Sequence, residues 1–221
     1  MAPPIFPTAP VAPAELLDVY LPEALAAFAE IEGAEDLDGS LGLQLVGESG
    51  GEWVLELVGG RLRVRPGSRA ETPLSFVQSV EHWRAALWQG RGAGIGRAIA
   101  RMFRAAPAPS APPRSLAPAA RASLDALRKL DGLLRVAVAE PGEGAWHADL
   151  RLGPGDLPRR PTTTVSLRGR DADRLLTGRL NPLEAYLAGK VRLSGDYGLL
   201  LQLHAAGREV GGAFGGGRGR A

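Results

Sequence analysis

The 221-residue chain contains no cysteine, few aromatic residues and almost no lysine. The absence of cysteine excludes disulfides, thiolate nucleophiles and cysteine-ligated metal sites. Aromatic residues make up only 5% of the chain, so few side chains are available for stacking on nucleic-acid bases. Lys129 and Lys190 are the only lysines, and a formal net charge of +2 is too small to indicate nucleic acid as a partner.

The sequence also lacks long hydrophobic runs. No apolar run approaches the roughly 18 residues that cross a bilayer. The first residues, MAPPIFPTAPVAPAE, have neither the charged start nor the uninterrupted apolar stretch of a secretory signal. With 45% apolar residues the chain has enough for a buried core. We therefore expect a globular, cytoplasmic protein.

Histidine is scarce, and the three histidines are scattered. His82, His147 and His204 do not show the spacing of metal ligands, and no serine–histidine–aspartate grouping can be argued from the sequence. We therefore expect no bound metal, no cofactor and no catalytic residue.

Proline and glycine divide the chain into segments. The 18 prolines gather near the start and near the middle, and glycine dominates the end of the chain. The expected segments are a disordered proline-rich lead (1–13), a first folded unit (14–104), a Pro/Ala linker (105–115), a second folded unit (116–206) and a flexible Gly/Arg-rich tail (207–221).

The two folded units share a pattern that recurs with an offset of 93 positions. In the first unit Asp38-Gly39 is followed by alternating leucines and then by Trp53. In the second unit Asp131-Gly132 is followed by alternating apolar residues and then by Trp146. A strand, a turn and a tryptophan in one register predict two tandem copies of one unit.

Each unit is predicted to contain a helix, then a meander of strands, then short helices. The expected helices are 22–32, 79–89, 116–130 and 171–177, and the expected strands are 41–46, 53–58, 61–65, 133–139, 146–152 and 162–168. This order predicts an α+β fold in which helices cover one face of an antiparallel sheet.

The stretch from Leu175 to Leu203 holds the most specific local pattern. Gly178 ends one helix, and Asn181-Pro182 provides an N-cap and a first-turn proline for a second helix that ends at Gly189. Val191 and Leu193 then alternate with basic residues as in an edge strand. A turn at 195–196 leads into a leucine-rich closing helix.

This pattern resembles the end of the sterol carrier protein 2 (SCP-2) domain, and the resemblance covers most of 116–205. The residues that carry it are Gly178, Arg179, Leu180, Asn181, Pro182, Ala185, Gly189, Lys190, Val191, Leu193, Gly195, Asp196 and Leu200. The resemblance implies an apolar tunnel between the sheet and the helices that holds a sterol, a fatty acyl chain or a similar lipid, without catalysis.

Lipid-contacting side chains are expected among the apolar residues of this stretch. They are Leu175, Leu176, Leu180, Leu183, Tyr186, Leu187, Val191, Leu193, Leu199, Leu200 and Leu203. Leucines at helical spacing also suit an ordinary core. The alternative function is therefore a structural or scaffolding accessory that keeps the fold without a ligand.

The first unit departs from the pattern after 79–89. A glycine-rich segment and a basic amphipathic helix at 95–104 stand where the second short helix and last strand would be, so the first unit is interpreted as a divergent copy. Ile95, Ile99, Met102 and Phe103 share that helix with arginines. It would contact an anionic membrane surface during lipid exchange, or else pack as a lid with its arginines in water.

Two motifs resemble those of short-chain dehydrogenases. Residues 90–100 resemble a glycine-rich cofactor loop, and Tyr186 and Lys190 have the spacing of a catalytic pair. The glycine loop should follow a strand, yet 79–89 is a predicted helix. Gly189 also interrupts the helix that should carry both catalytic residues. An NAD(P)-dependent reductase is therefore disfavoured.

Overall fold

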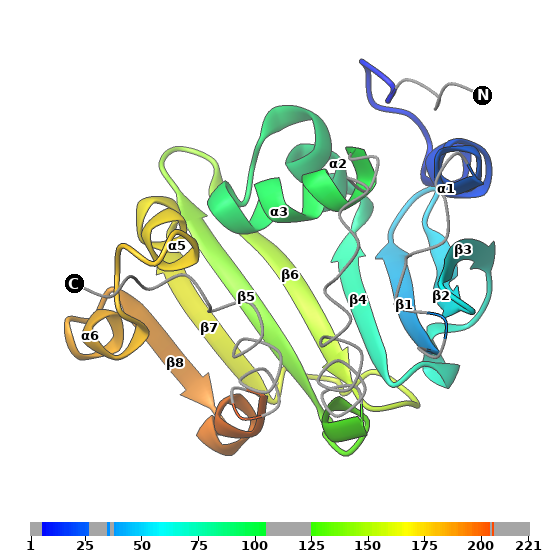
Figure 1. Ribbon diagram of the computed structural model, residues 1–221. Coiled ribbons are helices and arrows are strands. Elements are labelled where there is room, and N and C mark those ends of the chain that lie inside the picture. Colours follow the sequence, from blue (N-terminus) through cyan, green and yellow to red (C-terminus); the bar gives the residue numbers. More distant parts are fainter. Residues whose placement is uncertain (1–5, 27–34, 36–37, 105–124, 204, 206–221) are drawn as a thin grey trace, which may run out of the picture.

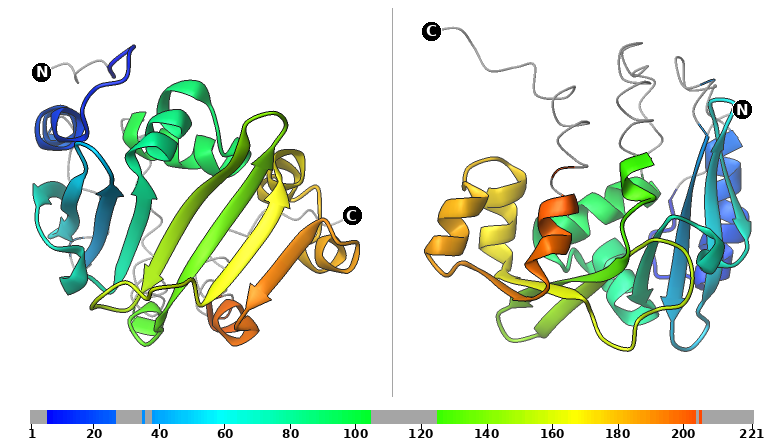
Figure 2. Two further views of the ribbon diagram at one scale, coloured as in Figure 1. Left: turned by 180° about the vertical axis from the view of Figure 1, so that it is seen from behind. Right: turned by 90° about the horizontal axis from the view of Figure 1, so that it is seen from below.

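The protein folds around a single eight-stranded sheet. A computed structural model describes residues 6–26, 35, 38–104, 125–203 and 205. The strand order is β3-β2-β1-β4-β6-β5-β7-β8, so the two halves of the chain each contribute four adjacent strands. Helices α3, α5 and α6 lie on the side of the sheet that faces the viewer in Figure 1, and the view from behind in Figure 2 shows bare strands.

The first half contains four strands and its helices in an interleaved order. The elements are the π-helix η1 (Glu15–Tyr20), α1 (Leu21–Ala26), β1 (Gly39–Val46), β2 (Gly51–Val58), β3 (Arg61–Pro66), the 3-10 turn η2 (Arg69–Glu71), β4 (Leu74–Ser79), α2 (Val80–Gln89) and α3 (Ala93–Arg104). Ser79 caps α2 by accepting a hydrogen bond from the amide of His82.

The second half repeats the order of hairpin, third strand and helix. Its elements are β5 (Gly132–Glu140), β6 (Gly144–Leu152), β7 (Thr163–Arg168), α5 (Gly169–Leu176), α6 (Pro182–Leu187) and β8 (Val191–Gly195), with helical turns at 125–127 and 197–203. Asn181 caps α6, because its side-chain oxygen accepts from the amides of Leu183 and Glu184. The cap and the edge strand β8 agree with the sequence prediction.

The sheet is mixed, so the prediction of an antiparallel sheet is wrong. β1 pairs parallel with β4, and β5 pairs parallel with β7. The parallel pairs arise because β4 and β7 each return beside the first strand of the preceding hairpin. The chain leaves β3, crosses through η2 and returns on the other side of β1. After β6 the connecting segment crosses to the other side of β5.

Strand β4 is absent from the sequence prediction, and it joins the two halves. Leu74, Phe76 and their neighbours pair antiparallel with residues 149–152 of β6. Both halves thus contain an antiparallel hairpin whose first strand also pairs parallel with a later strand. A duplication is consistent with that pairing, but the hairpin registers differ. Leu43 faces Trp53, whereas Val138 rather than Val136 faces Trp146. The tandem repeat stays a prediction.

The predicted helices match the described residues in part. The expected helix 79–89 corresponds to α2, and 171–177 corresponds to α5. Helical structure at the start of the chain begins at residue 13, well before the predicted 22. Residues 27–32 of the first expected helix and 116–124 of another lie outside the described residues, as do the linker 105–115 and the tail 207–221.

Part of the proline-rich lead packs against the first half. The ring of Phe6 lies 5.5 Å from those of Tyr20 and Trp88, and the Trp88 indole donates to the carbonyl of Pro7 at 3.0 Å. The Arg84 guanidinium donates to the carbonyl of Val11. Residues 6–11, which belong to the segment expected to be disordered, therefore contact the first half.

No helix among the described residues is both long enough and apolar enough to cross a bilayer.

Candidate functional site

Strand residues of the second half alternate between the helix-covered inner face and the bare outer face of the sheet. At the upper end in Figure 1, beneath α3 and α5, the inner face is packed tightly. We call these buried residues the upper cluster: Ala86, Val138, Trp146, Ala148, Leu167, Ala172, Leu180, Ala185 and Val191. At the opposite end a smaller lower cluster contains Leu130, Leu152 and Leu199.

Between the two clusters runs a band of apolar side chains that are only partly buried. This inner band consists of Phe76, Leu150, Val136, Val165 and Leu193. Phe76 and Leu150 are partners across β4 and β6, and the last three are partners across β5, β7 and β8. The band therefore crosses five strands from the centre of the sheet to its edge.

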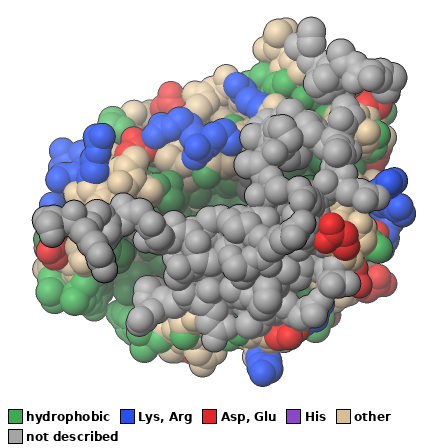
Figure 3. All heavy atoms as spheres, viewed as in Figure 1, with side chains coloured by type: hydrophobic (Ala, Val, Ile, Leu, Met, Phe, Trp, Pro, Cys, Tyr) green, Lys and Arg blue, Asp and Glu red, His purple; other side chains and the backbone are tan. Residues whose placement is uncertain are grey.

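The inner band is incompletely covered even though its strands are central. On β5 the inner-facing residues to either side of Val136 are Leu134 and Val138, and both are buried. On β7 the same is true of Thr163 and Leu167 around Val165. The described helices thus cover the two ends of this inner face more fully than its middle. Figure 3 shows hydrophobic side chains in a hollow on this face, below the arginines that lie over α3.

The predicted lipid-contacting residues fall into an inward group and an outward group. Leu193 belongs to the inner band, while Leu180 and Val191 are buried in the upper cluster and Leu175 packs against it. Leu199 is buried in the lower cluster with Leu203 packed against it. Leu200 is partly buried on the same helical turn.

The outward group lies on α5 and α6. Leu187 is 75% exposed, Leu183 66%, Leu176 58% and Tyr186 43%. Because Ala185 is the α6 residue buried against the sheet, its neighbours on the helix point away from it. The structure does not bring these four side chains together with the inner band, and a role for them in lipid contact stays a prediction.

The sequence prediction of lipid-contacting residues did not include four members of the inner band. Phe76, Val136, Leu150 and Val165 lie on strands, whereas the predicted set came from the leucine-rich stretch that resembles a family motif. Alternation along 133–139 and 162–168 was the available signal, because inward-facing positions follow from it. Which of those positions would stay partly uncovered depends on how the helices cross the sheet.

Helix α3 comes from the first half but covers part of the second. Ala93, Ile95 and Ile99 pack against the upper cluster, while Ala100 and Phe103 are buried in the core of the first half. The apolar side of this amphipathic helix is therefore occupied, and Arg97, Arg101 and Arg104 are exposed. This arrangement favours the packed-lid interpretation of 95–104 within the described side chains, which do not include that of Met102. Membrane contact through the arginines stays a prediction.

The glycine-rich segment permits close packing. Gly92 has φ = 81°, and a Cβ there would come within 2.8 Å of the Trp146 ring. A Cβ at Gly94 would come within 2.8 Å of Leu176, because α3 crosses close to α5. The preceding element is helix α2, and α6 ends at Leu187, before Lys190. These observations confirm the structural reasons for disfavouring a dehydrogenase-like cofactor loop.

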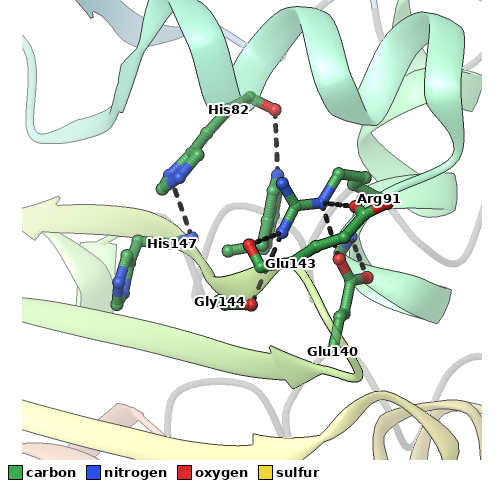
Figure 4. A network of polar contacts seen from close by, with 8 residues as sticks. His82, Arg91, Glu140, Glu143, Gly144 and His147 are labelled. Carbon is green, nitrogen blue, oxygen red and sulfur yellow. Dashed lines mark hydrogen bonds and ion pairs between the residues drawn. The ribbon is translucent and has the colours of Figure 1, made fainter.

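A polar network fixes the α2–α3 junction over the β5–β6 turn (Figure 4). The Arg91 guanidinium contacts the Glu140 carboxylate at 2.8 Å and that of Glu143 at 3.0 Å. The amide of Gly92 donates to Glu140 at 2.7 Å. The Arg91 and Glu140 side chains are only 15% and 16% exposed, so these contacts are shielded from water. The network holds α3 in place at the upper end of the inner band.

The same junction brings two of the scattered histidines together. The amide of His147 donates to Nδ1 of His82 at 3.1 Å, and the two rings lie 5.5 Å apart. Desolvation lowers the pKa of His147, and the charges of His82 and Arg135 lower it further against the opposing effect of Asp149. No group of three or more possible metal ligands occurs among the described residues, and His204 lies outside them.

Residues 115–206 match the model of the SCP-2 sterol transfer family. The C-terminal half therefore carries an SCP-2 sterol transfer domain. Within the described residues the matched region contains β5 to β8, α5, α6 and the turns at 125–127 and 197–203. It excludes β4 and α3, so Phe76 of the inner band and the helix over its upper end come from outside the SCP-2 domain.

Curated relatives match the same part of the chain. Rat sterol carrier protein 2 is 29% identical over 86 residues, which cover 36% of this chain and 16% of the relative. Hydroxysteroid dehydrogenase-like protein 2 of Xenopus tropicalis is 26% identical over 84 residues, which cover 36% of this chain and 20% of the relative. The chain thus spans only about a fifth or less of the length of these relatives.

Among solved structures, the sterol carrier protein domain 2 of Helicoverpa armigera aligns with 44% of this chain and 78% of its own. Its sequence identity is 20%, and its TM-score is 0.32.

Proposed function

We propose that the chain binds and carries a hydrophobic ligand, such as a sterol or a fatty acyl chain, on the inner band of its SCP-2 domain. The observation that carries the proposal is the inner band itself. Five apolar side chains lie on the inner face of five neighbouring strands, and they remain only partly buried beside two buried clusters. The family match to 115–206 supports a lipid as the occupant.

The energetics favour a long apolar ligand over a polar one. Each buried methylene contributes roughly 0.8 kcal/mol, so a long chain gains on the order of 10 kcal/mol before the costs of association. Valine, leucine and phenylalanine offer no hydrogen bonds to the ligand. An apolar surface of this kind selects its ligand by size and shape and distinguishes little between head groups.

The proposal does not include catalysis. The side chains of the inner band have no group that could transfer a proton, attack a substrate or hold a cofactor. The relatives whose names are those of enzymes share only a small part of their length with this chain. A carrier in the cytoplasm, with transient membrane contact during exchange, remains the proposed setting, to be tested by cell fractionation.

Titration with a fluorescent fatty acid and with a fluorescent sterol tests the proposal. Val165→Trp places a large ring on the inner band, so we expect it to weaken binding at least tenfold. Thr164→Trp is the matched control, because the adjacent residue on β7 points to the outer face. If Val165→Trp lowers stability, Leu193→Trp on the edge strand provides a second test of binding to the inner band.

Wild-type protein that binds neither probe would contradict the proposal and favour a scaffolding accessory, whereas thermal stabilisation by NAD(P) would favour a reductase.

A further inference from the structure

The outer face of the sheet holds a pocket that the lipid-carrying function does not use. Its volume is about 440 Å³, and strands β5, β6, β7 and the start of β8 form it. Ala137, Ala139 and Ala145 make the floor. Ala139 and Ala145 are cross-strand partners, and all three side chains lie on the face opposite the upper cluster. Figure 2 (left) shows that no described helix covers this face.

The pocket forms because its floor residues are small and its border residues are long. Alanine is depleted in strands, where larger side chains normally cover the pleated surface. Three alanines on neighbouring strands leave a depression that polar side chains surround. Arg168, Lys190 and Arg192 border it with positive charge, and Ser166 adds a hydroxyl group.

Two of the three cations are uncompensated within the described part of the chain. Arg168 donates to the Asp171 carboxylate at 3.2 Å, so its charge is partly neutralised. Neither Lys190 nor Arg192 forms a salt bridge with a described acidic residue. Glu140, at the end of β5, is occupied by Arg91 and by the amide of Gly92. The pocket therefore carries an excess of about two positive charges.

We propose that this outer pocket binds a phosphate monoester. The phosphate group lies between Lys190 and Arg192 and accepts a hydrogen bond from Ser166, and a compact apolar group rests on the alanine floor. A phosphate monoester carries nearly two negative charges at pH 7 and so matches the two uncompensated cations. The volume falls in the range of small-molecule sites, which is roughly 300–1,000 Å³.

Isothermal titration calorimetry of the full chain with phenyl phosphate tests this site. We expect saturable binding that Lys190→Glu and Arg192→Glu each weaken at least tenfold. Ala139→Leu keeps the charge but fills the floor, and it should weaken binding by a similar factor. Arg63→Glu, an exposed arginine on β3, is the charge-matched control and should bind like wild type. Benzoate has the same ring and one charge fewer, so we expect it to bind at least tenfold more weakly.

Vesicles distinguish a lipid head group from a free metabolite as the source of the phosphate. If co-sedimentation with phosphatidic acid vesicles requires Lys190 and Arg192, and phenyl phosphate competes with it, the pocket binds a membrane phosphate. Phenyl phosphate binding without co-sedimentation supports a soluble phosphate monoester. No binding of phenyl phosphate, equal binding by all variants, or equal affinity for benzoate would overturn the proposal.

The outer pocket and the inner band can be tested independently, because they lie on opposite faces of the same strands. Lys190→Glu should leave the affinity for the fluorescent fatty acid unchanged, and Val165→Trp should leave phenyl phosphate binding unchanged. A failure of one proposal therefore leaves a clear result for the other.

Discussion

The two halves of the sheet differ in how fully their inner faces are filled. On β1, Leu43 is 2% exposed and belongs to a cluster with Trp53, Trp83 and Phe103. On β5, Val136 lies 93 positions later and is only partly buried. At this level of the sheet, large aromatic rings pack with Leu43 in the first half, whereas Val136 in the second half has no aromatic ring in its cluster other than Trp146 and Phe76 and is only partly buried.

The comparison also explains how the second half can keep a partly uncovered apolar surface without loss of the fold. A partly uncovered apolar surface costs stability, and the closed half and the polar α2–α3 junction offset that cost. α3 contributes to both, because its residues pack on the first-half core and on the upper cluster. The first half therefore supports the second half through α3.

The largest expected effect comes from removing a large side chain from the core of the first half. Trp83 is fully buried and packs edge-on against Trp88 and Phe103. Trp83→Ala should lower the free energy of unfolding by about 3–5 kcal/mol, as measured by urea denaturation. A loss of less than about 1 kcal/mol would show that the first half is not the rigid support that we describe.

A matched pair of truncations tests the comparison directly. Leu43→Ala should cost about 2–5 kcal/mol, because it leaves a cavity in a packed core. Val136→Ala should cost about 1 kcal/mol, because its side chain is already partly uncovered. Denaturation of both variants in the absence of lipid gives the two values. Equal losses would mean that the two inner faces are filled alike.

Removing the polar network at the α2–α3 junction should have a moderate effect on stability. Arg91→Ala leaves Glu140 without its ion pair in a shielded position, and we expect a loss of about 1–3 kcal/mol. Arg128→Ala, whose partner Asp125 is exposed, serves as the control and should change stability little. If the two variants lose the same stability, the junction does not fix α3 over the sheet.

The smallest expected effect is a dependence on pH at the same junction. The folded state lowers the pKa of His147 below its ordinary value near 6.5. The unfolded chain therefore binds this proton first as the pH falls. Its contribution to stability is present above pH ~6.5 and is lost below that value. His147→Gln should reduce the fall in melting temperature between pH 7.5 and 5.5, and an unchanged fall would assign it to other groups.

Much of the fold follows from local patterns. Alternation located seven strands because their inward residues are apolar, and Ser79, Asn181 and Gly189 mark the ends of helices. β4 was missed because Leu74–Ser79 leads directly into a helix. The parallel pairs were missed because they depend on how distant segments cross. No local pattern specifies such a crossing.

The candidate site was predicted less well than the fold. The leucine-rich stretch contributes Leu193 to the inner band. The other four members of the band lie on strands whose alternation alone marks them only as inward-facing. Whether such a residue is core or site depends on the coverage by helices, and one of these, α3, comes from the other half of the chain.

The pairing of β4 with β6 bears on any attempt to dissect the molecule. Cutting the chain between the halves would convert two central strands into edge strands. Each edge would then present a row of unsatisfied amides and carbonyls that recruits other chains. Arg69 would also lose the carbonyl of Gly155. A fragment limited to the family-matched residues is therefore expected to self-associate, and its lipid binding would not report on that of the intact chain.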